Sequence, residues 1–266
     1  MAAFQIALQH NNYAASLIEQ GKLDDAIASL TPCIRTLREY RNIQQGEEAT
    51  TTTTPVISSC FDLAKTLDQF MAIRPDQHQQ QQDDMMDTDS SCTSNNSINV
   101  NKSCYQSGGF TYDRAVYVPE VLSVTSNPKS FALATVVVMF NLALAHHLKA
   151  ATSLSAHGPY GIHQHQSFLK AARLYELCYN LIVKQDLMDS SSIQFSLAIV
   201  NNLGMIYHAL NETAKAKKYF EQSLSIIMFM VDNGMGDSID QLDGYFRNTT
   251  TFGGIGTKRS VTAAAA

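Results

Sequence analysis

The feature that most constrains the fold is an internal repeat of 24 residues. The stretch NNYAASLIEQGKLDDAIASLTPCI, which starts at Asn11, aligns without a gap with NNLGMIYHALNETAKAKKYFEQSL, which starts at Asn201. In both stretches apolar residues recur every three or four residues, the spacing that places them on one face of an α-helix. Gly21 separates two such runs and suits a helix end, because glycine adopts the left-handed conformation found there. The repeat therefore predicts helix–turn–helix units and an all-α chain.

A third copy of the unit lies between the other two and is interrupted by a loop around Gly158–Gly161. Small residues recur in register in all three copies, where they let two helices approach closely and let the next hairpin stack. In the first helices these residues are Ala14, Ala143 and Gly204, and in the second helices they are Ala26, Cys33, Ala171, Cys178, Ala216 and Ser223.

This order of residues resembles the tetratricopeptide repeat (TPR), a helix–turn–helix unit with Leu-Gly, Tyr, Ala, an aromatic residue and a small residue at fixed positions. The wording NNLGMIYHAL is similar to kinesin-light-chain repeats and to stand-alone TPR-like proteins of microbial eukaryotes. The Trp and the closing Pro of the pattern are missing. The resemblance implies a right-handed array of three helical hairpins with a C-terminal capping helix. An unrelated helical bundle with the same Leu/Ala periodicity is the alternative.

The array is expected to be interrupted by a long, largely disordered insert that is acidic and rich in Gln. The chain has 24 acidic and 19 basic residues, and five of the acidic residues lie between Asp76 and Asp89. Such a composition buries too little apolar surface to offset the entropy of ordering. Pro32 is expected to kink or break the second helix. The expected divisions are a first hairpin at 1–43, the insert at 44–124, the other two hairpins at 125–250 and a flexible tail at 251–266. The insert is expected to contain a short helix at 60–71 and an extended segment or small hairpin at 109–118. The capping helix is expected near 237–246, at the end of the third division.

The apolar stretch at 131–148 approaches the length of a membrane span. Thr135, Asn141 and the pair His146–His147 interrupt it, and a buried central helix explains it as well. Five cysteines without a CxxC pair argue against a disulfide framework or a zinc site. With no signal peptide at the N-terminus of the sequence, a cytoplasmic, reducing location is expected.

A recurring asparagine is the main candidate for function. Asn12, Asn141 and Asn202 each precede the apolar–small pair of a first helix, so one Asn falls at the same point of every hairpin. An amide side chain offers a donor and an acceptor, which suits a peptide backbone. The alternative is that these side chains bond the helix backbone or the neighbouring hairpin. The predicted concave peptide-binding face comprises Asn11, Asn12, Phe140, Asn141, Leu144, His147, Asn201, Asn202, Met205 and His208.

The function expected from these patterns is a non-catalytic adaptor that binds an extended peptide or a helix in the concave groove. The alternative is a structural scaffold whose groove is filled by its own insert, through 60–71 or 109–118, or by a second copy of the chain. No catalytic motif is present, and His163 and His165 lack the spacing of a helical metal pair. We therefore expect no enzyme activity, cofactor or metal. The net charge of −5 argues against nucleic acid, and no membrane partner is expected.

Overall fold

The computed structural model describes residues 2–48, 109–118, 128–154, 162–184, 190–235 and 242–253. All the regular secondary structure in these ranges is helical, as the repeat predicted. The helices are α1 (Ala2–Glu19), α2 (Leu23–Glu48), α4 (Pro128–Leu154), α5 (Ile162–Lys184), α6 (Ser190–Ala209), α7 (Thr213–Asp232) and α8 (Leu242–Phe252). The short helix expected at 60–71 lies outside the described residues.

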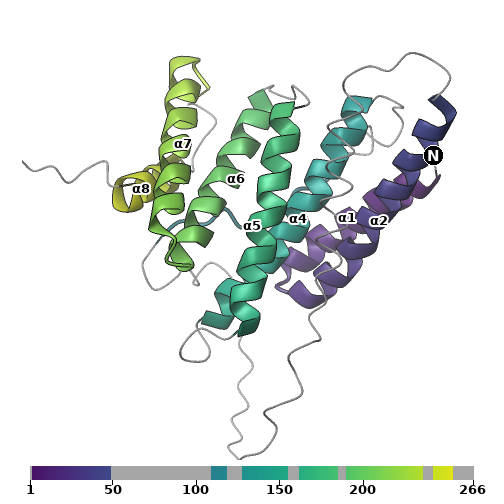
Figure 1. Cartoon of the computed structure of the whole chain (residues 1–266), viewed down its shortest axis with the longest axis horizontal. Helices are drawn as coiled ribbons and strands as arrows, with labels where there is room; N and C mark the ends of the chain where they lie inside the picture. Colours follow the sequence, from purple (N-terminus) through teal and green to yellow (C-terminus); the bar gives the residue numbers. More distant parts are fainter. Residues whose placement is uncertain are drawn as a thin grey trace, which may run out of the picture.

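The helices pack as consecutive antiparallel-type hairpins in chain order, α1 with α2, α4 with α5 and α6 with α7. The hairpins stand side by side in one row from the purple end to the yellow end of Figure 1. Each hairpin packs on the next through α2 with α4 and α5 with α6, and α8 follows α7 in the same manner. The all-α array of three hairpins with a further C-terminal helix is therefore confirmed. That last helix begins at Leu242, and residues 237–241 lie outside the described part.

The first helices of the two aligned repeats end in the same way. Gly21 has a φ of 72°, and Asn211, at the aligned position, has a φ of 59°. The N–H of Gly21 donates to the carbonyl of Ile18 at 2.9 Å, and the N–H of Asn211 donates to the carbonyl of His208 at 3.0 Å. Glycine and asparagine tolerate this left-handed conformation better than other residues do, so both end a helix there.

Helix α2 continues through Pro32, where the sequence indicated a kink or a break. Proline inside a helix costs about 3 kcal/mol, because it lacks an N–H and crowds the preceding turn. Leu30, Ile34 and Leu37 flank it on the buried face, with at most 4% of each residue exposed. Full burial of one such side chain contributes about 1.5–3 kcal/mol. The packing of this face on the neighbouring helices therefore outweighs the cost of the proline.

Helix α4 is the central core helix of the array. Residues Phe131–Thr152 are long and apolar enough to cross a membrane, but 89% of the apolar window is buried inside the protein. Helices α1, α2 and α5 supply this cover. A helix that is apolar on most sides is normally buried, and here the protein itself provides the burial, as expected from the polar residues that interrupt the stretch.

The small residues of the repeat serve the close helix packing predicted for them. A Cβ atom added at Gly204 would lie 2.6 Å from the ring of Phe220 on the facing helix. The aligned residues Ala14 and Ala143 are fully buried. The second-helix positions Cys33, Cys178 and Ser223 are also buried.

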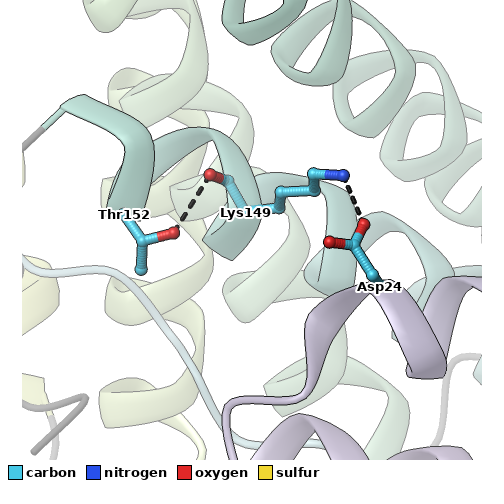
Figure 2. Close-up of polar contacts among 3 residues, drawn as sticks. All are labelled: Asp24, Lys149 and Thr152. Carbon is cyan, nitrogen blue, oxygen red and sulfur yellow. Dashed lines mark hydrogen bonds and ion pairs between the residues drawn. The ribbon is translucent and has the colours of Figure 1, made fainter. Parts of the chain in front are cut away.

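Polar contacts join neighbouring hairpins at their edges. In Figure 2, Lys149 of α4 reaches the carboxylate of Asp24 in the first turn of α2, and the hydroxyl of Thr152 donates to the Lys149 carbonyl at 3.1 Å. The Lys149 and Asp24 side chains are 43% and 77% exposed, so this ion pair contributes at most about 1 kcal/mol. The packing of one hairpin on the next therefore depends mainly on the apolar core.

Candidate functional site

Residues 109–118, hereafter the inner segment, lie against the first helices of the array and are bound there through their backbone. The N–H of Val118 donates to Oδ1 of Asn12 at 2.8 Å, and Nδ2 of Asn12 donates back to the Val118 carbonyl at 2.9 Å. Val116 makes the same pair of bonds with Asn141, at 2.9 Å and 2.7 Å. One asparagine of α1 and one of α4 thus each satisfy both backbone groups of one residue.

The same arrangement recurs at the other end of the inner segment. Tyr112 exchanges two hydrogen bonds with Asn202 of α6, at 3.0 Å and 2.9 Å. Phe110 exchanges two with Asn248 of α8, at 2.8 Å and 2.6 Å. The four asparagines, hereafter the asparagine ladder, come from α1, α4, α6 and α8. The inner segment therefore runs opposite to the order of the hairpins, with its N-terminal end at α8.

The alternation of bonded residues shows that the inner segment is extended rather than a hairpin. The bonded residues are two apart at each end, 110 with 112 and 116 with 118. In an extended chain every second residue presents its backbone groups to the same side. The sequence left open an extended segment or a small hairpin, and the extended form is observed.

A further asparagine supports the first half of the ladder. Asn11 accepts a hydrogen bond from Nδ2 of Asn141 at 2.9 Å. Its own Nδ2 donates to Oδ1 of Asn12 at 3.2 Å and to the carbonyl of Val116 at 3.3 Å. Asn11 therefore links α1 to α4 and fixes the orientation of both ladder amides.

Asn201 has the same role in the second half. It accepts from Nδ2 of Asn248 at 2.7 Å, and it donates to Oδ1 of Asn202 at 3.4 Å and to the carbonyl of Phe110 at 3.1 Å. Nδ2 of Asn202 also donates to the hydroxyl of Tyr175 at 3.1 Å. The asparagines therefore do both things that the sequence allowed. They bond asparagines of a neighbouring hairpin or helix, and they also bond the backbone of the inner segment.

Burial makes this bonding necessary. Five of the six asparagines are fully buried, and these are Asn11, Asn141, Asn201, Asn202 and Asn248. A buried amide group left without a hydrogen-bond partner costs about 1–3 kcal/mol. The inner segment supplies the donors and acceptors that the helices do not, so the face is polar and yet satisfied.

Aromatic contacts hold the N-terminal part of the inner segment. The ring of Phe110 meets Tyr245 edge-on, with 4.9 Å between ring centroids. Gly244 gives the Phe110 ring its place, because an added Cβ there would lie 2.5 Å from the ring. The ring of Tyr112 lies 6.1 Å from that of Phe140, and burial raises the pKa of Tyr112. This end of the segment is therefore selected by aromatic side chains as well as by backbone bonds.

The C-terminal part of the inner segment is held by aliphatic burial. Val118 is 3% exposed, and Val116 packs against the main core. Tyr117, between them, is 44% exposed, and its hydroxyl donates to Oε2 of Glu19 at 2.7 Å. Arg114, in the middle of the segment, is exposed. Arg114 and Tyr117 are thus the exposed side chains of the segment, whereas the side chains of the bonded residues are buried or partly buried.

The structure places the ten predicted residues in three groups. Asn11, Asn12, Asn141, Asn201 and Asn202 bond the inner segment, as described above. Phe140 and Met205 contact it through their side chains. For the other three, the contacts observed are with helices. Leu144 is fully buried in the core, His147 packs on Phe168 and Tyr175 of α5, and the centroid of the His208 ring lies 4.3 Å from that of Phe252.

Asn248 is the ladder residue that sequence reasoning missed. The other ladder asparagines precede an apolar and a small residue, whereas Asn248 precedes Thr249 and Thr250. The signal available was weaker, because Asn248 lies beyond the short helix predicted near 237–246, which was expected only to cover the end of the array. Helix α8 does pack on α7, but it also contributes one quarter of the ladder.

Burial keeps three titratable side chains of the array uncharged at neutral pH. Burial lowers the pKa of His147 to about 3 and, with the nearby Lys170 and Lys149, that of His146 to about 4. Burial raises the pKa of the Cys33 thiol to about 11. Within the ranges that the structure describes, no group of three or more His, Cys, Asp or Glu is placed to hold a metal ion. The chemistry that the site offers is therefore hydrogen bonding by neutral amides.

A comparison with protein-family models matches residues 197–227 to the tetratricopeptide repeat. The match covers most of the hairpin of α6 and α7, including Asn201 and Asn202. No curated protein and no solved structure matches the chain. The chain therefore contains a TPR, without a more specific family being indicated. Repeats of this kind suggest a scaffold for protein–protein interaction, and the proteins that carry them are usually non-catalytic.

Proposed function

We propose that the protein is a non-catalytic interaction scaffold that binds an extended peptide along its asparagine ladder, and that its own inner segment is the resting occupant. The carrying observation is that four asparagines each pair with both the N–H and the C=O of one residue. Every peptide carries these groups, so the ladder recognises an extended backbone, and neighbouring pockets select side chains. This unites the two alternatives that the sequence left open, an adaptor and a self-occupied scaffold.

The buried asparagines restrict what can occupy the ladder. If the inner segment left, water would reach their amide groups, and an occupant that covers them again must supply hydrogen-bond partners in place of water. Each unpaired buried polar group costs about 1–3 kcal/mol. A partner peptide that makes the same bonds removes this cost, whereas an apolar surface does not. The ladder therefore favours exchange of one extended peptide for another.

The binding of the inner segment is balanced closely enough for exchange. Ordering one residue costs about 1–2 kcal/mol of backbone entropy. One hydrogen bond contributes about 0.5–1.5 kcal/mol net. Since the two terms are similar in size, burial of side chains such as Phe110 and Val118 decides how tightly an occupant is held. A partner with comparable side chains then competes with the inner segment.

The test weakens the inner segment without touching the ladder. In the full chain, Val116→Pro with Val118→Pro removes two N–H donors and keeps side chains of similar size. The matched control is Ala115→Pro with Tyr117→Pro, whose N–H groups make no hydrogen bond among the described residues. This control also loses the Tyr117 hydroxyl that bonds Glu19. That loss weakens the inner segment in the control, so it reduces the expected difference between the control and the test variant. The probe is a fluorescent, end-capped synthetic peptide with the sequence of the inner segment.

The Val116→Pro, Val118→Pro protein is hereafter the released variant. We expect it to bind the labelled peptide at least about tenfold more tightly than the wild type or the control does, which corresponds to about 1.4 kcal/mol of binding free energy. Circular dichroism must show the same helix content for all three proteins. If the released variant is folded and its segment exchanges amide protons rapidly, yet it binds no peptide, the proposal is wrong. The inner segment would then be a permanent structural part of a closed scaffold.

A further inference from the structure

The orientation of the ladder amides gives the bound peptide a direction. Each ladder asparagine turns Oδ1 to the N–H and Nδ2 to the C=O of the same residue, as at Val116 and Phe110. Along an extended chain the N–H of a residue precedes its C=O. The order of Oδ1 and Nδ2 along the face therefore matches only one direction of the peptide.

Two asparagine pairs hold the amides in this orientation. Nδ2 of Asn141 donates to Oδ1 of Asn11 at 2.9 Å, and Nδ2 of Asn248 donates to Oδ1 of Asn201 at 2.7 Å. Turning either ladder amide over would set two oxygen acceptors against each other. Both pairs are fully buried, so water does not readily relieve that contact. Asn11 and Asn201 are therefore positioning residues for the direction of the peptide.

The hydroxyl of Tyr175 is a weaker device of the same kind. It accepts from Nδ2 of Asn202 at 3.1 Å. A hydroxyl both donates and accepts, so it adapts if the Asn202 amide turns. The two asparagine pairs therefore carry most of the directional selection.

Side-chain contacts are asymmetric in the same direction. The end of the inner segment at α8 places Phe110 and Tyr112 on aromatic neighbours, Tyr245 and Phe140. The end at α1 buries the aliphatic Val118. Between these anchors the charged side chain of Arg114 is exposed.

We propose that the ladder takes partner peptides in this one direction, N-terminal end at α8, and selects the pattern aromatic-x-aromatic-x-x-x-aliphatic-x-aliphatic. The partner is thus an extended segment of a protein with two aromatic residues followed by two β-branched or similar aliphatic residues, as at 110, 112, 116 and 118 of this chain. This inference rests on the proposed function, because it specifies the ligand of the same ladder.

The test measures binding of four end-capped synthetic peptides to the released variant, Val116→Pro with Val118→Pro. The first has the sequence of the inner segment, and the second has that sequence in reverse order. The third replaces the residues equivalent to Phe110 and Tyr112 by Ala, and the fourth replaces those equivalent to Thr111 and Asp113 by Ala. The reversed peptide has the same composition, but it cannot match the anchors and the amide order at once.

We expect the reversed and the anchor-deficient peptides to bind at least about tenfold more weakly than the first peptide, while the fourth binds within about threefold. Equal binding of the first two peptides, or of the first and third, overturns the inference and leaves the proposed function intact. Failure of all four peptides to bind instead contradicts the proposed function.

A second variant isolates the positioning role. Asn11→Ala in the released variant removes the acceptor that orients Asn141. We expect the ratio of affinities for the forward and reversed peptides to fall by at least about threefold, whereas a purely structural loss would weaken both peptides and leave the ratio unchanged. An unchanged ratio therefore overturns the role of Asn11 in setting direction.

Discussion

Replacement of Asn141 by Ala should be the most damaging single change in the ladder. It removes the hydrogen bonds to the Val116 N–H at 2.9 Å, to the Val116 carbonyl at 2.7 Å and to Oδ1 of Asn11 at 2.9 Å. The Val116 carbonyl keeps the bond from Asn11 at 3.3 Å. The Val116 N–H and the Asn11 oxygen lose these partners at a fully buried position. At about 1–3 kcal/mol each, the loss in unfolding free energy is about 2–6 kcal/mol.

The measurement is urea unfolding followed by circular dichroism, with two matched variants. Asn141→Leu keeps the side-chain volume, so a similar cost shows that polar groups and not a cavity dominate. Asn12→Ala is the weaker control, because Asn12 is only partly buried and water can replace its amide; we expect about 1 kcal/mol. The amide proton of Val116 should also exchange faster in Asn141→Ala, while that of Val118 is less affected. A smaller cost for Asn141→Ala than for Asn12→Ala would refute the reasoning.

Three further outcomes follow from the described structure. Burial lowers the pKa of His147 from 6.5 to about 3, so the contribution of His147 to the unfolding free energy is constant above pH 6.5. As the pH drops from 6.5 towards 3, the unfolding free energy should fall by about 1.4 kcal/mol per pH unit, because only the unfolded chain takes up the proton. Urea titrations of His147→Gln should show a smaller fall in unfolding free energy over this range. Gly204→Ala would bring a Cβ within 2.6 Å of the Phe220 ring and should cost about 1–3 kcal/mol, part of which Phe220→Leu recovers in thermal melts. Cys33 and Cys178 should react slowly with thiol reagents until the chain is unfolded, because burial raises both thiol pKa values; mass spectrometry of labelled protein before and after urea checks this.

The repeat made much of the ladder predictable. Asn12, Asn141 and Asn202 share one position because the small residue two places later fixes how each first helix meets its partner. Close packing at Gly204 allows little rotation of the helix, so the neighbouring side chains keep their direction. Periodicity therefore placed three of the four ladder asparagines on one face.

Periodicity failed where another helix covers the same side. His147 lies seven residues, or about two turns, after Phe140, so the helical spacing placed it on the predicted peptide-binding face. In the structure its ring lies 5.9 Å from that of Phe168 and 6.0 Å from that of Tyr175, both on α5. Spacing within one helix gives the direction of a side chain but not the width of the face that its partner helix buries. The sequence likewise left the identity of the occupant open, because hydrogen bonds to backbone groups suit any extended segment.

The ladder consists of two equivalent halves, which explains both the missed residue and the register of the inner segment. Asn248 stands to Asn201 as Asn141 stands to Asn11, each donating to the asparagine of the preceding first helix. Helix α8 also contacts α6 and α7, as α4 contacts α1 and α2. By these contacts α8 packs in the way that a first helix packs on the preceding hairpin, and it also covers α7. Within each half the bonded residues are two apart, but 112 and 116 are four apart, so the chain crosses the junction of α5 with α6 without ladder bonds. The ladder therefore bonds two short extended stretches of the inner segment, and the residues between them make no ladder bonds.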